Sequence, residues 1–131
     1  ARPFLFSTAQ PPAVVAAIIA AIDLMETDSS YTDKLWANTR YWQDNLKALG
    51  FDLGVTETPI TPVIVGEEAK AQQLQKELFE EGVLALSVVF PTVPRGKARI
   101  RTMPNASHSI EDLDIAFAAM GRVGRKLGII A

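Results

Sequence analysis

The feature that most constrains this 131-residue chain is an uninterrupted apolar run over residues 11–22, which Asp23 closes. The run is too short for a transmembrane helix, which needs about 20 apolar residues. Arg2 is the only cation before it and no small-residue cleavage motif follows, so it matches a secretory signal peptide poorly. Because the run is apolar on nearly every side, it predicts a helix over 13–27 that is buried between other elements.

The composition excludes several classes of protein. A hydrophobic content of 48% with a net charge of −2 excludes intrinsic disorder, and the length suits one domain. The absence of Cys and the single His exclude a disulfide framework and a Cys- or His-cluster metal site, so we expect no metal. An acidic pI near 5.4 argues against nucleic acid, and we expect no membrane partner either. The lack of Cys favours a reducing compartment, so the chain is expected to be cytoplasmic.

Three further helices are indicated by apolar residues that recur three and four positions apart. The first begins with a Ser30–Asp33 capping box, and the last is opened by Ser109 with Asp112. Together with the first helix, their order around the strands predicts an α+β domain, a small sheet with helices packed on it. These helices are expected over 30–49, 67–81 and 109–127.

Strands are predicted over 60–65, 83–90 and 98–102. Pro62 lacks an N–H, which places the first strand at a sheet edge or its start near the proline. The apolar run of the second strand is continuous, so we expect both of its faces to be covered. Alternation in the third strand places Arg99 and Arg101 on one face of the sheet.

The two arginines are the strongest local candidates for chemistry. An arginine fork on a strand that follows a proline-stiffened loop suits bidentate capture of a carboxylate or phosphate. The alternative without a function is an exposed strand face that carries two solvated charges. Spacing alone favours this alternative by about two to one, because surface arginine is common. We find no G-x-S-x-G, Walker A or G-x-G-x-x-G motif in the chain.

Other polar and aromatic residues have a structural interpretation beside the functional one. His108 can act as a near-neutral titrating group, but a hydrogen-bonded loop histidine is the better expectation. Trp36 and Trp42 fit core or interface anchors better than a binding patch. Ser7 and Thr8 can bind a phosphate near a helix start, although plain capping of the first helix is locally favoured.

Four segments carry a resemblance to a known family. They are RPFLFSTAQPP (2–12), LWANTRYWQDNLKALGFD (35–52), TPITPVIVGEEAKA (58–71) and the stretch from FPTVPRGKARIR to IEDLD (90–114). Together they resemble the α-oxoamine synthases, which are fold-type I pyridoxal-phosphate enzymes. The likeness covers essentially the whole chain and is greatest to the glycine C-acetyltransferase members, also called 2-amino-3-ketobutyrate coenzyme A ligases.

The resemblance implies a homodimeric acyltransferase that condenses an amino acid with an acyl-CoA. Pyridoxal phosphate serves as the electron sink, and the protein supplies geometry and charge. Arg101 matches the family's arginine for the amino-acid carboxylate. Ser7 and, less securely, Thr8 match hydroxyl positions that reach the cofactor phosphate of the neighbouring subunit. Glycine and acetyl-CoA are the expected substrates.

The resemblance also implies what the chain lacks. The family's Schiff-base lysine precedes the R-P-F-L-F-S segment, and none of the six lysines here lies in its motif. The chain thus resembles the C-terminal part of such an enzyme. Residues 1–30 match a connecting segment with a helix of the large domain, and 31–131 the small C-terminal domain, with the lysine domain missing upstream. We expect no catalytic residue in the chain, and no cofactor retention or turnover by the chain alone.

Two alternatives remain open at this point. Within the family, 8-amino-7-oxononanoate synthase of biotin synthesis uses alanine and a pimeloyl thioester, and the sequence does not separate it from the first choice. Outside the family, the chain can be a free-standing α+β module that binds a small anion or a partner protein through Arg99 and Arg101.

Overall fold

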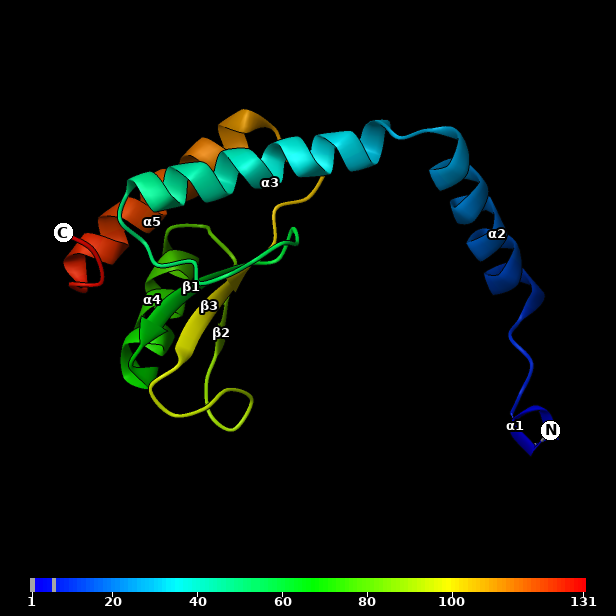
Figure 1. The fold of residues 1–131 in the computed structure, drawn as a ribbon, viewed down its shortest axis with the longest axis horizontal. Helices are drawn as coiled ribbons and strands as arrows, with labels where there is room; N and C mark the ends of the chain where they lie inside the picture. The colour runs from blue at the N-terminus through cyan, green and yellow to red at the C-terminus, as the bar shows by residue number, and fades with distance from the viewer. Residues whose placement is uncertain (1, 6) are drawn as a thin grey trace. The chain divides into compact units, whose positions relative to one another are not determined.

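A computed structural model describes residues 2–5 and 7–131, and Figure 1 shows the ribbon of the chain. The chain divides into two compact units, Ala1–Tyr31 and Thr32–Ala131. The first unit holds two helices, α1 (Arg2–Leu5) and α2 (Pro12–Thr27). Sequence reasoning did not predict α1, whose four residues are too few for a periodic pattern.

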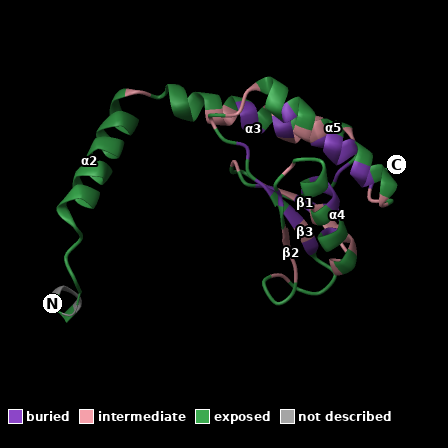
Figure 2. Ribbon diagram, turned by 180° about the vertical axis from the view of Figure 1, so that it is seen from behind, coloured by how far each residue is buried: buried purple, intermediate pink, exposed green. Residues whose placement is uncertain are grey.

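The long helix of the first unit forms as expected. α2 begins at Pro12, because proline's fixed φ and missing N–H suit the first helical position. None of its residues is buried within the chain (Figure 2). Ile18 and Ile19, for example, are about half exposed. The expected burial is therefore not met by the part of the chain that the structure describes. The apolar composition of the helix is nearly uniform around its axis, so no face of it is polar.

Three more helices agree with the predicted ranges to within a few residues. The box predicted at Ser30 and Asp33 is wrong, because Ser30 is already helical and its N–H donates to Asp28 Oδ1 at 2.9 Å. The box at Ser109 and Asp112 is confirmed, with both reciprocal hydrogen bonds formed. The helices are α3 (Ser30–Ala48), α4 (Glu68–Glu80) and α5 (Ile110–Lys126).

The sheet is antiparallel and has three strands, β1 (Thr61–Gly66), β2 (Leu86–Val88) and β3 (Ala98–Thr102). Their order is β1-β3-β2, so β3 is central. β1 lies at an edge and begins one residue before Pro62, which agrees with both expectations, since proline has no N–H to donate to a neighbouring strand. These elements confirm the predicted α+β class with a small sheet.

The second predicted strand is only partly confirmed. Three residues pair with β3 in place of the expected eight, and β2 is an edge strand. Leu84 is 87% exposed and Leu86 55% exposed, so the expected cover on both faces is wrong. The reason is tertiary, because a single layer of helices covers one face of this sheet and leaves the other face open.

The core lies between the sheet and helices α3, α4 and α5. α4 contacts all three strands and α5. Alternate residues of the edge and central strands, such as Val63 and Ile100, are fully buried against Leu46, Leu74 and Met120 of the helices. The opposite face of the sheet carries no helix in the unit Thr32–Ala131, and this open face positions the site described next.

Candidate functional site

The alternation predicted for β3 is confirmed residue by residue. Ala98, Ile100 and Thr102 are buried in the core, whereas Arg99 is half-buried and Arg101 is exposed. Because successive side chains of a strand point to opposite faces, both arginines project from the open face of the sheet. The sequence pattern therefore predicted correctly the face of the sheet on which the two arginines lie.

The edge strands surround these arginines with apolar side chains. Pro62 of β1 and Leu86 of β2 stand opposite Arg101 in the register. Ile64 and Val88 stand opposite Arg99. Directly opposed residues share a face in an antiparallel sheet, so the two guanidinium groups stand among apolar side chains on this face. These apolar neighbours offer no side-chain acceptors that would compete with a bound anion for the two arginines.

Arg101 is uncommitted within the described residues. Its side chain makes no ion pair or hydrogen bond to any of them. Other cations of the same unit are engaged, since Arg122 binds Glu81 and Lys126 binds Glu77. A free planar fork on a rigid strand is the arrangement that captures a carboxylate bidentately.

The loop that leads into β3 is held by local contacts. The Cζ atom of Arg95 lies 4.3 Å from the centroid of the Phe90 ring, a cation–π distance. Lys97 N donates to the carbonyl of Pro94 at 3.1 Å, and Gly96 between them has a φ of +73°. Glycine is the residue that adopts this left-handed conformation without strain. The turn brings the chain into the central strand just ahead of Arg99.

A buried polar network stiffens β3 from the other side. Trp42 Nε1 donates to Thr102 Oγ1 at 2.8 Å, and Thr102 Oγ1 donates to the carbonyl of Thr61 at 2.9 Å. The network joins α3, β3 and β1 directly behind Arg101. Sequence analysis favoured Trp42 as a core residue, and its 4% exposure confirms that interpretation. Trp36 is half-buried on the same helix.

The loop after β3 is fixed by Asn38, which sequence analysis missed. Its side-chain amide is buried and donates to the carbonyls of Asn105 and His108, at 2.8 and 3.0 Å. Its burial could have been predicted from its position four residues before Trp42, on the same face of the helix. The His108 ring accepts at Nδ1 from the N–H of Asn105 at 3.3 Å, which confirms the hydrogen-bonded loop histidine.

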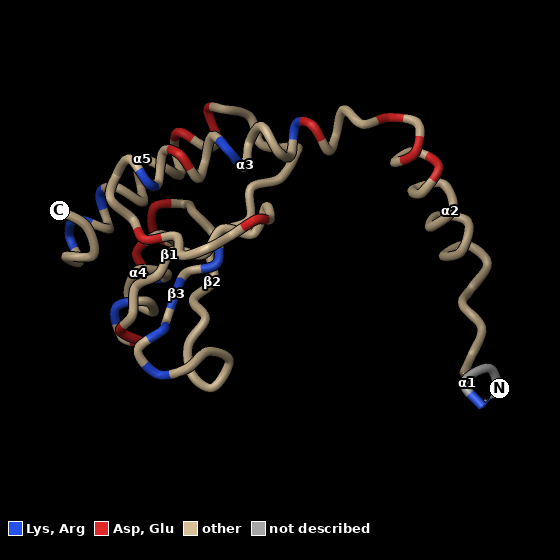
Figure 3. Tube along the Cα trace, viewed as in Figure 1, with Lys and Arg blue, Asp and Glu red and all other residues tan. Residues whose placement is uncertain are grey.

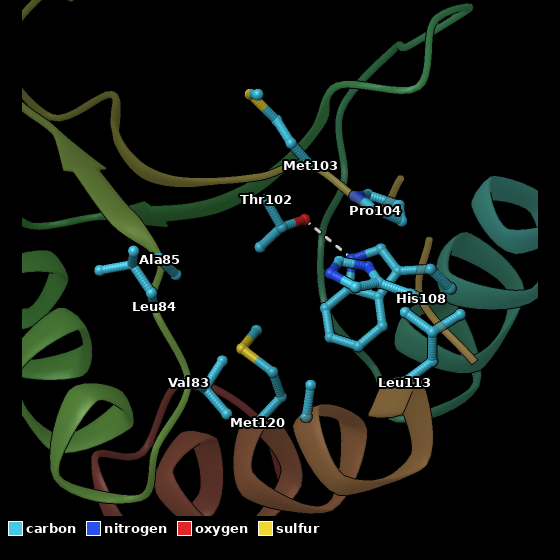
Figure 4. Close-up of a pocket in the computed structure, with 11 residues that line it drawn as sticks. Val83, Leu84, Ala85, Thr102, Met103, Pro104, His108, Leu113 and Met120 are labelled. Atoms are coloured by element: carbon cyan, nitrogen blue, oxygen red, sulfur yellow. Dashed lines mark hydrogen bonds between the residues drawn. The ribbon is translucent and has the colours of Figure 1, made fainter. Parts of the chain in front are cut away.

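An apolar pocket lies beside this loop (Figure 4). His108, Met103 and Pro104 line it together with Trp42 and Met120 from the helices. Thr102 also lines it, so the pocket is on the opposite side of β3 from Arg101. The pocket and the arginine face are therefore separate features of the unit Thr32–Ala131.

Ser7 and Thr8 lie in the first unit and are exposed. Their hydroxyls do not cap α2, because the N-cap residue is Pro11 and no side chain bonds the first turn. The capping interpretation favoured locally is therefore wrong. Since neither hydroxyl bonds a described residue, both remain available as donors to a phosphate, which is the role that the resemblance implies.

The described residues hold no group of three or more His, Asp or Glu side chains able to bind a metal ion. No described helix is long and apolar enough to cross a membrane. The residues present fit only a part of a pyridoxal-phosphate site. By the resemblance, Ser7 and Thr8 would hold the cofactor phosphate and Arg101 the substrate carboxylate, whereas Lys126, for example, is paired with Glu77 at 2.9 Å.

Comparison with known families gives a match along most of the chain. A model of aminotransferase class I and II matches residues 1–120. The chain belongs to the aminotransferase class I and II family. This membership agrees with the fold-type I resemblance and with the α+β domain described above.

Curated relatives narrow the family further. The chain is 60% identical to an 8-amino-7-oxononanoate synthase of Symbiobacterium thermophilum and 57% identical to one of Thermoanaerobacter pseudethanolicus. Each alignment covers 98% of this chain and 33% of the relative. A Thermus thermophilus relative, 52% identical over 99% of this chain and 33% of its own length, is named 8-amino-7-oxononanoate synthase/2-amino-3-ketobutyrate coenzyme A ligase. The chain thus spans about a third of the length of these proteins.

Solved structures support the same fold. A serine palmitoyltransferase of Sphingomonas wittichii superposes with a TM-score of 0.91 at 31% identity, covering 99% of this chain and 33% of that one. An 8-amino-7-oxononanoate synthase of Francisella tularensis, at 20% identity, superposes with a TM-score of 0.74 over 95% of this chain and 36% of that one. Other serine palmitoyltransferase structures hold PLP, so pyridoxal phosphate is a cofactor in this group of relatives.

These comparisons confirm the α-oxoamine synthase resemblance at the level of the group. They do not confirm the preference for glycine C-acetyltransferase, because the relatives above are named first for 8-amino-7-oxononanoate synthesis. The segments quoted above do not distinguish the two reactions.

Proposed function

We propose that this chain is part of a pyridoxal-phosphate acyltransferase, an 8-amino-7-oxononanoate synthase that condenses alanine with a pimeloyl thioester. The observation that carries the proposal is the 57–60% identity to proteins of that name along nearly the whole chain. In the parent enzyme the chain would form the C-terminal third, and the parent would be a cytoplasmic homodimer. The family membership gives no support to a free-standing binding module.

Arg101 has a defined task in this function. It holds the carboxylate of the amino acid through two parallel N–H···O bonds, which fixes the substrate's rotation as well as its position. The antiparallel partners of β3 and the Trp42–Thr102 hydrogen bond behind it hold the backbone that carries Arg101 in place. Orientation of this kind brings reacting groups together without an entropy loss during the reaction.

Ser7 and Thr8 have the second task. Their hydroxyls are exposed, and we propose that they donate to the cofactor phosphate of the neighbouring subunit. When bound, pyridoxal phosphate supplies an electron sink for the carbanion formed at the amino acid. The lysine that anchors the cofactor would come from the part of the parent enzyme outside this chain.

A second function is favoured by one specific observation. The Thermus thermophilus relative carries the name 2-amino-3-ketobutyrate coenzyme A ligase beside the synthase name. Condensation of glycine with acetyl-CoA is therefore the second candidate. Both reactions use Arg101 in the same way, because both amino acids present the same carboxylate.

The test is a substrate competition in the full-length enzyme that contains this chain. Release of free CoA is followed with alanine plus pimeloyl-CoA and with glycine plus acetyl-CoA. We expect kcat/KM to favour the first pair by at least about 10-fold, the lower end of the range for a single methylene in a pocket. A preference for glycine plus acetyl-CoA would select the second candidate, and no CoA release with either pair would refute both.

A further inference from the structure

Four basic residues recur at every second position from the loop before β3 to the end of that strand. They are Arg95, Lys97, Arg99 and Arg101, referred to here as the basic strip. No Asp or Glu occurs between residues 82 and 110, although the whole chain has 15 acidic residues and a net charge of −2. The strip is therefore a local concentration of positive charge in an acidic protein.

The structure leaves the charge of the strip unneutralised. Three members are exposed and Arg99 is half-buried. The ion pairs formed among residues 2–5 and 7–131 join Lys70, Arg122 and Lys126 to glutamates and include no member of the strip. Figure 3 shows the blue segments repeating along β3 and the loop that precedes it. Uncompensated charges on one surface attract an oppositely charged ligand.

Two local contacts hold members of the strip in place. Arg99 Nε donates to the carbonyl of Lys97 at 3.2 Å, which leaves its terminal nitrogens available. Arg95 is held over the Phe90 ring by its cation–π contact. Lys97 immediately precedes β3, and at roughly 3.4 Å per residue its Cα lies about 14 Å along the strand from that of Arg101. The strip is therefore an extended row of cations with one end at the carboxylate anchor.

We propose that the basic strip binds the phosphate groups of the coenzyme A thioester substrate, an inference that rests on the proposed function. New C–C bond formation requires the thioester carbonyl to lie next to the amino acid held at Arg101. The phosphates are at the opposite end of coenzyme A from its thioester. They therefore lie away from Arg101, and Lys97 and Arg95 are the phosphate-binding members, with Arg99 between the two ends.

The chemistry favours this ligand over a second carboxylate. A phosphate presents several anionic oxygens, and arginine and lysine are its usual partners in proteins. A single carboxylate needs one guanidinium, which Arg101 already supplies. Lys97 and Arg95 together match a ligand with more than one phosphate, as coenzyme A has.

The test measures CoA affinity in the full-length enzyme by calorimetric titration, which needs no turnover. The variants are Lys97→Gln and Arg95→Gln. The matched control is Arg40→Gln, because Arg40 is an exposed arginine on α3 that lies outside the strip. Each strip variant should weaken CoA binding about fivefold at low ionic strength, the upper end for one exposed ion pair. The loss should shrink at high salt, because exposed charges are screened.

Two further measurements test whether the phosphates of CoA account for the loss of affinity. Lys97→Arg should restore most of the affinity, since it keeps the charge. 3′-Dephospho-CoA and pantetheine should show smaller losses in the Gln variants than CoA does. Unchanged CoA affinity in the Lys97→Gln/Arg95→Gln double variant, or an equal loss in Arg40→Gln, would overturn the proposal.

These outcomes separate the strip from the proposed function. If CoA binding depends on the strip but neither amino acid and thioester pair reacts, the proposed function fails and the strip stands. If the synthase reaction proceeds while the double variant binds CoA like the parent, the strip fails and the proposed function stands.

Discussion

The indole N–H of Trp42 donates to Thr102 Oγ1 at 2.8 Å, in the core directly behind Arg101. The Thr102 hydroxyl in turn donates a hydrogen bond to the carbonyl of Thr61, so one buried chain of hydrogen bonds connects α3 to two strands. Buried polar groups are costly when unpaired, and here each donor has its acceptor. The arrangement couples the stability of the core to the position of the strand that carries the candidate site.

Trp42→Phe should destabilise the chain by about 1–3 kcal/mol, because it removes the donor to a buried hydroxyl. The free energy of unfolding in urea measures the effect. Trp36→Phe is the control, since Trp36 is half-buried on the same helix and its side chain takes no part in this network. Equal losses in the two variants would show that the hydrogen bond contributes nothing beyond indole packing.

Gly124→Ala should be destabilising although alanine is the better helix former. A Cβ at Gly124 would lie 2.6 Å from Cζ of the Phe51 ring, which no relaxed contact allows. Overpacking of this kind costs about 1–3 kcal/mol, more than the roughly 1 kcal/mol that helix propensity returns. Thermal unfolding measures the loss. The double variant Phe51→Leu/Gly124→Ala should be more stable than additivity predicts, and strict additivity would contradict the clash.

Glu77 should make the stability of the chain depend on pH in the acidic range. Gln73 donates to Glu77 Oε1 at 2.9 Å and Lys126 Nζ lies 2.9 Å from Oε2, and these two partners lower the pKa of Glu77 below its ordinary 4.5. A lowered pKa in the folded state contributes stability that is present above pH 4.5 and is lost as the pH falls through the folded value.

The measurement is the melting temperature of the parent and of Glu77→Gln as the pH is lowered from neutral. The parent should be the more stable at neutral pH, and the difference should close below pH 4.5. Glu80→Gln serves as the control because Glu80 is an exposed residue on the same helix. A difference that stays constant with pH would show that charge on Glu77 plays no part.

Arg101→Lys should weaken amino-acid binding in the full-length enzyme by roughly tenfold or more, the scale of a lost charge-assisted hydrogen bond. Lysine keeps the charge but lacks the planar fork that holds both carboxylate oxygens. The readout is the KM for alanine at saturating thioester. Arg40→Lys is the matched control on α3, outside the site. An unchanged KM for alanine would remove Arg101 from the carboxylate role.

Local pattern predicted much of this chain because the interactions involved lie close in sequence. The Ser109–Asp112 box, the alternation of β3 and the constraint that Pro62 places on β1 are all decided within a few residues. The same alternation placed Arg101 on an exposed face. The roles of Arg101, Ser7 and Thr8, by contrast, came from a family resemblance and stay predictions.

The tertiary structure alone decided which faces are covered and which side chains meet. The apolar run at 83–90 gives a three-residue edge strand with Leu84 exposed, since helices pack on only one face of the sheet. Trp42 and Thr102, 60 residues apart, meet only because α3 and β3 contribute to the same core. Sequence periodicity reports which side of one element is apolar. It carries no information on which element, if any, will cover that side, because burial is settled by partners that are distant in the sequence.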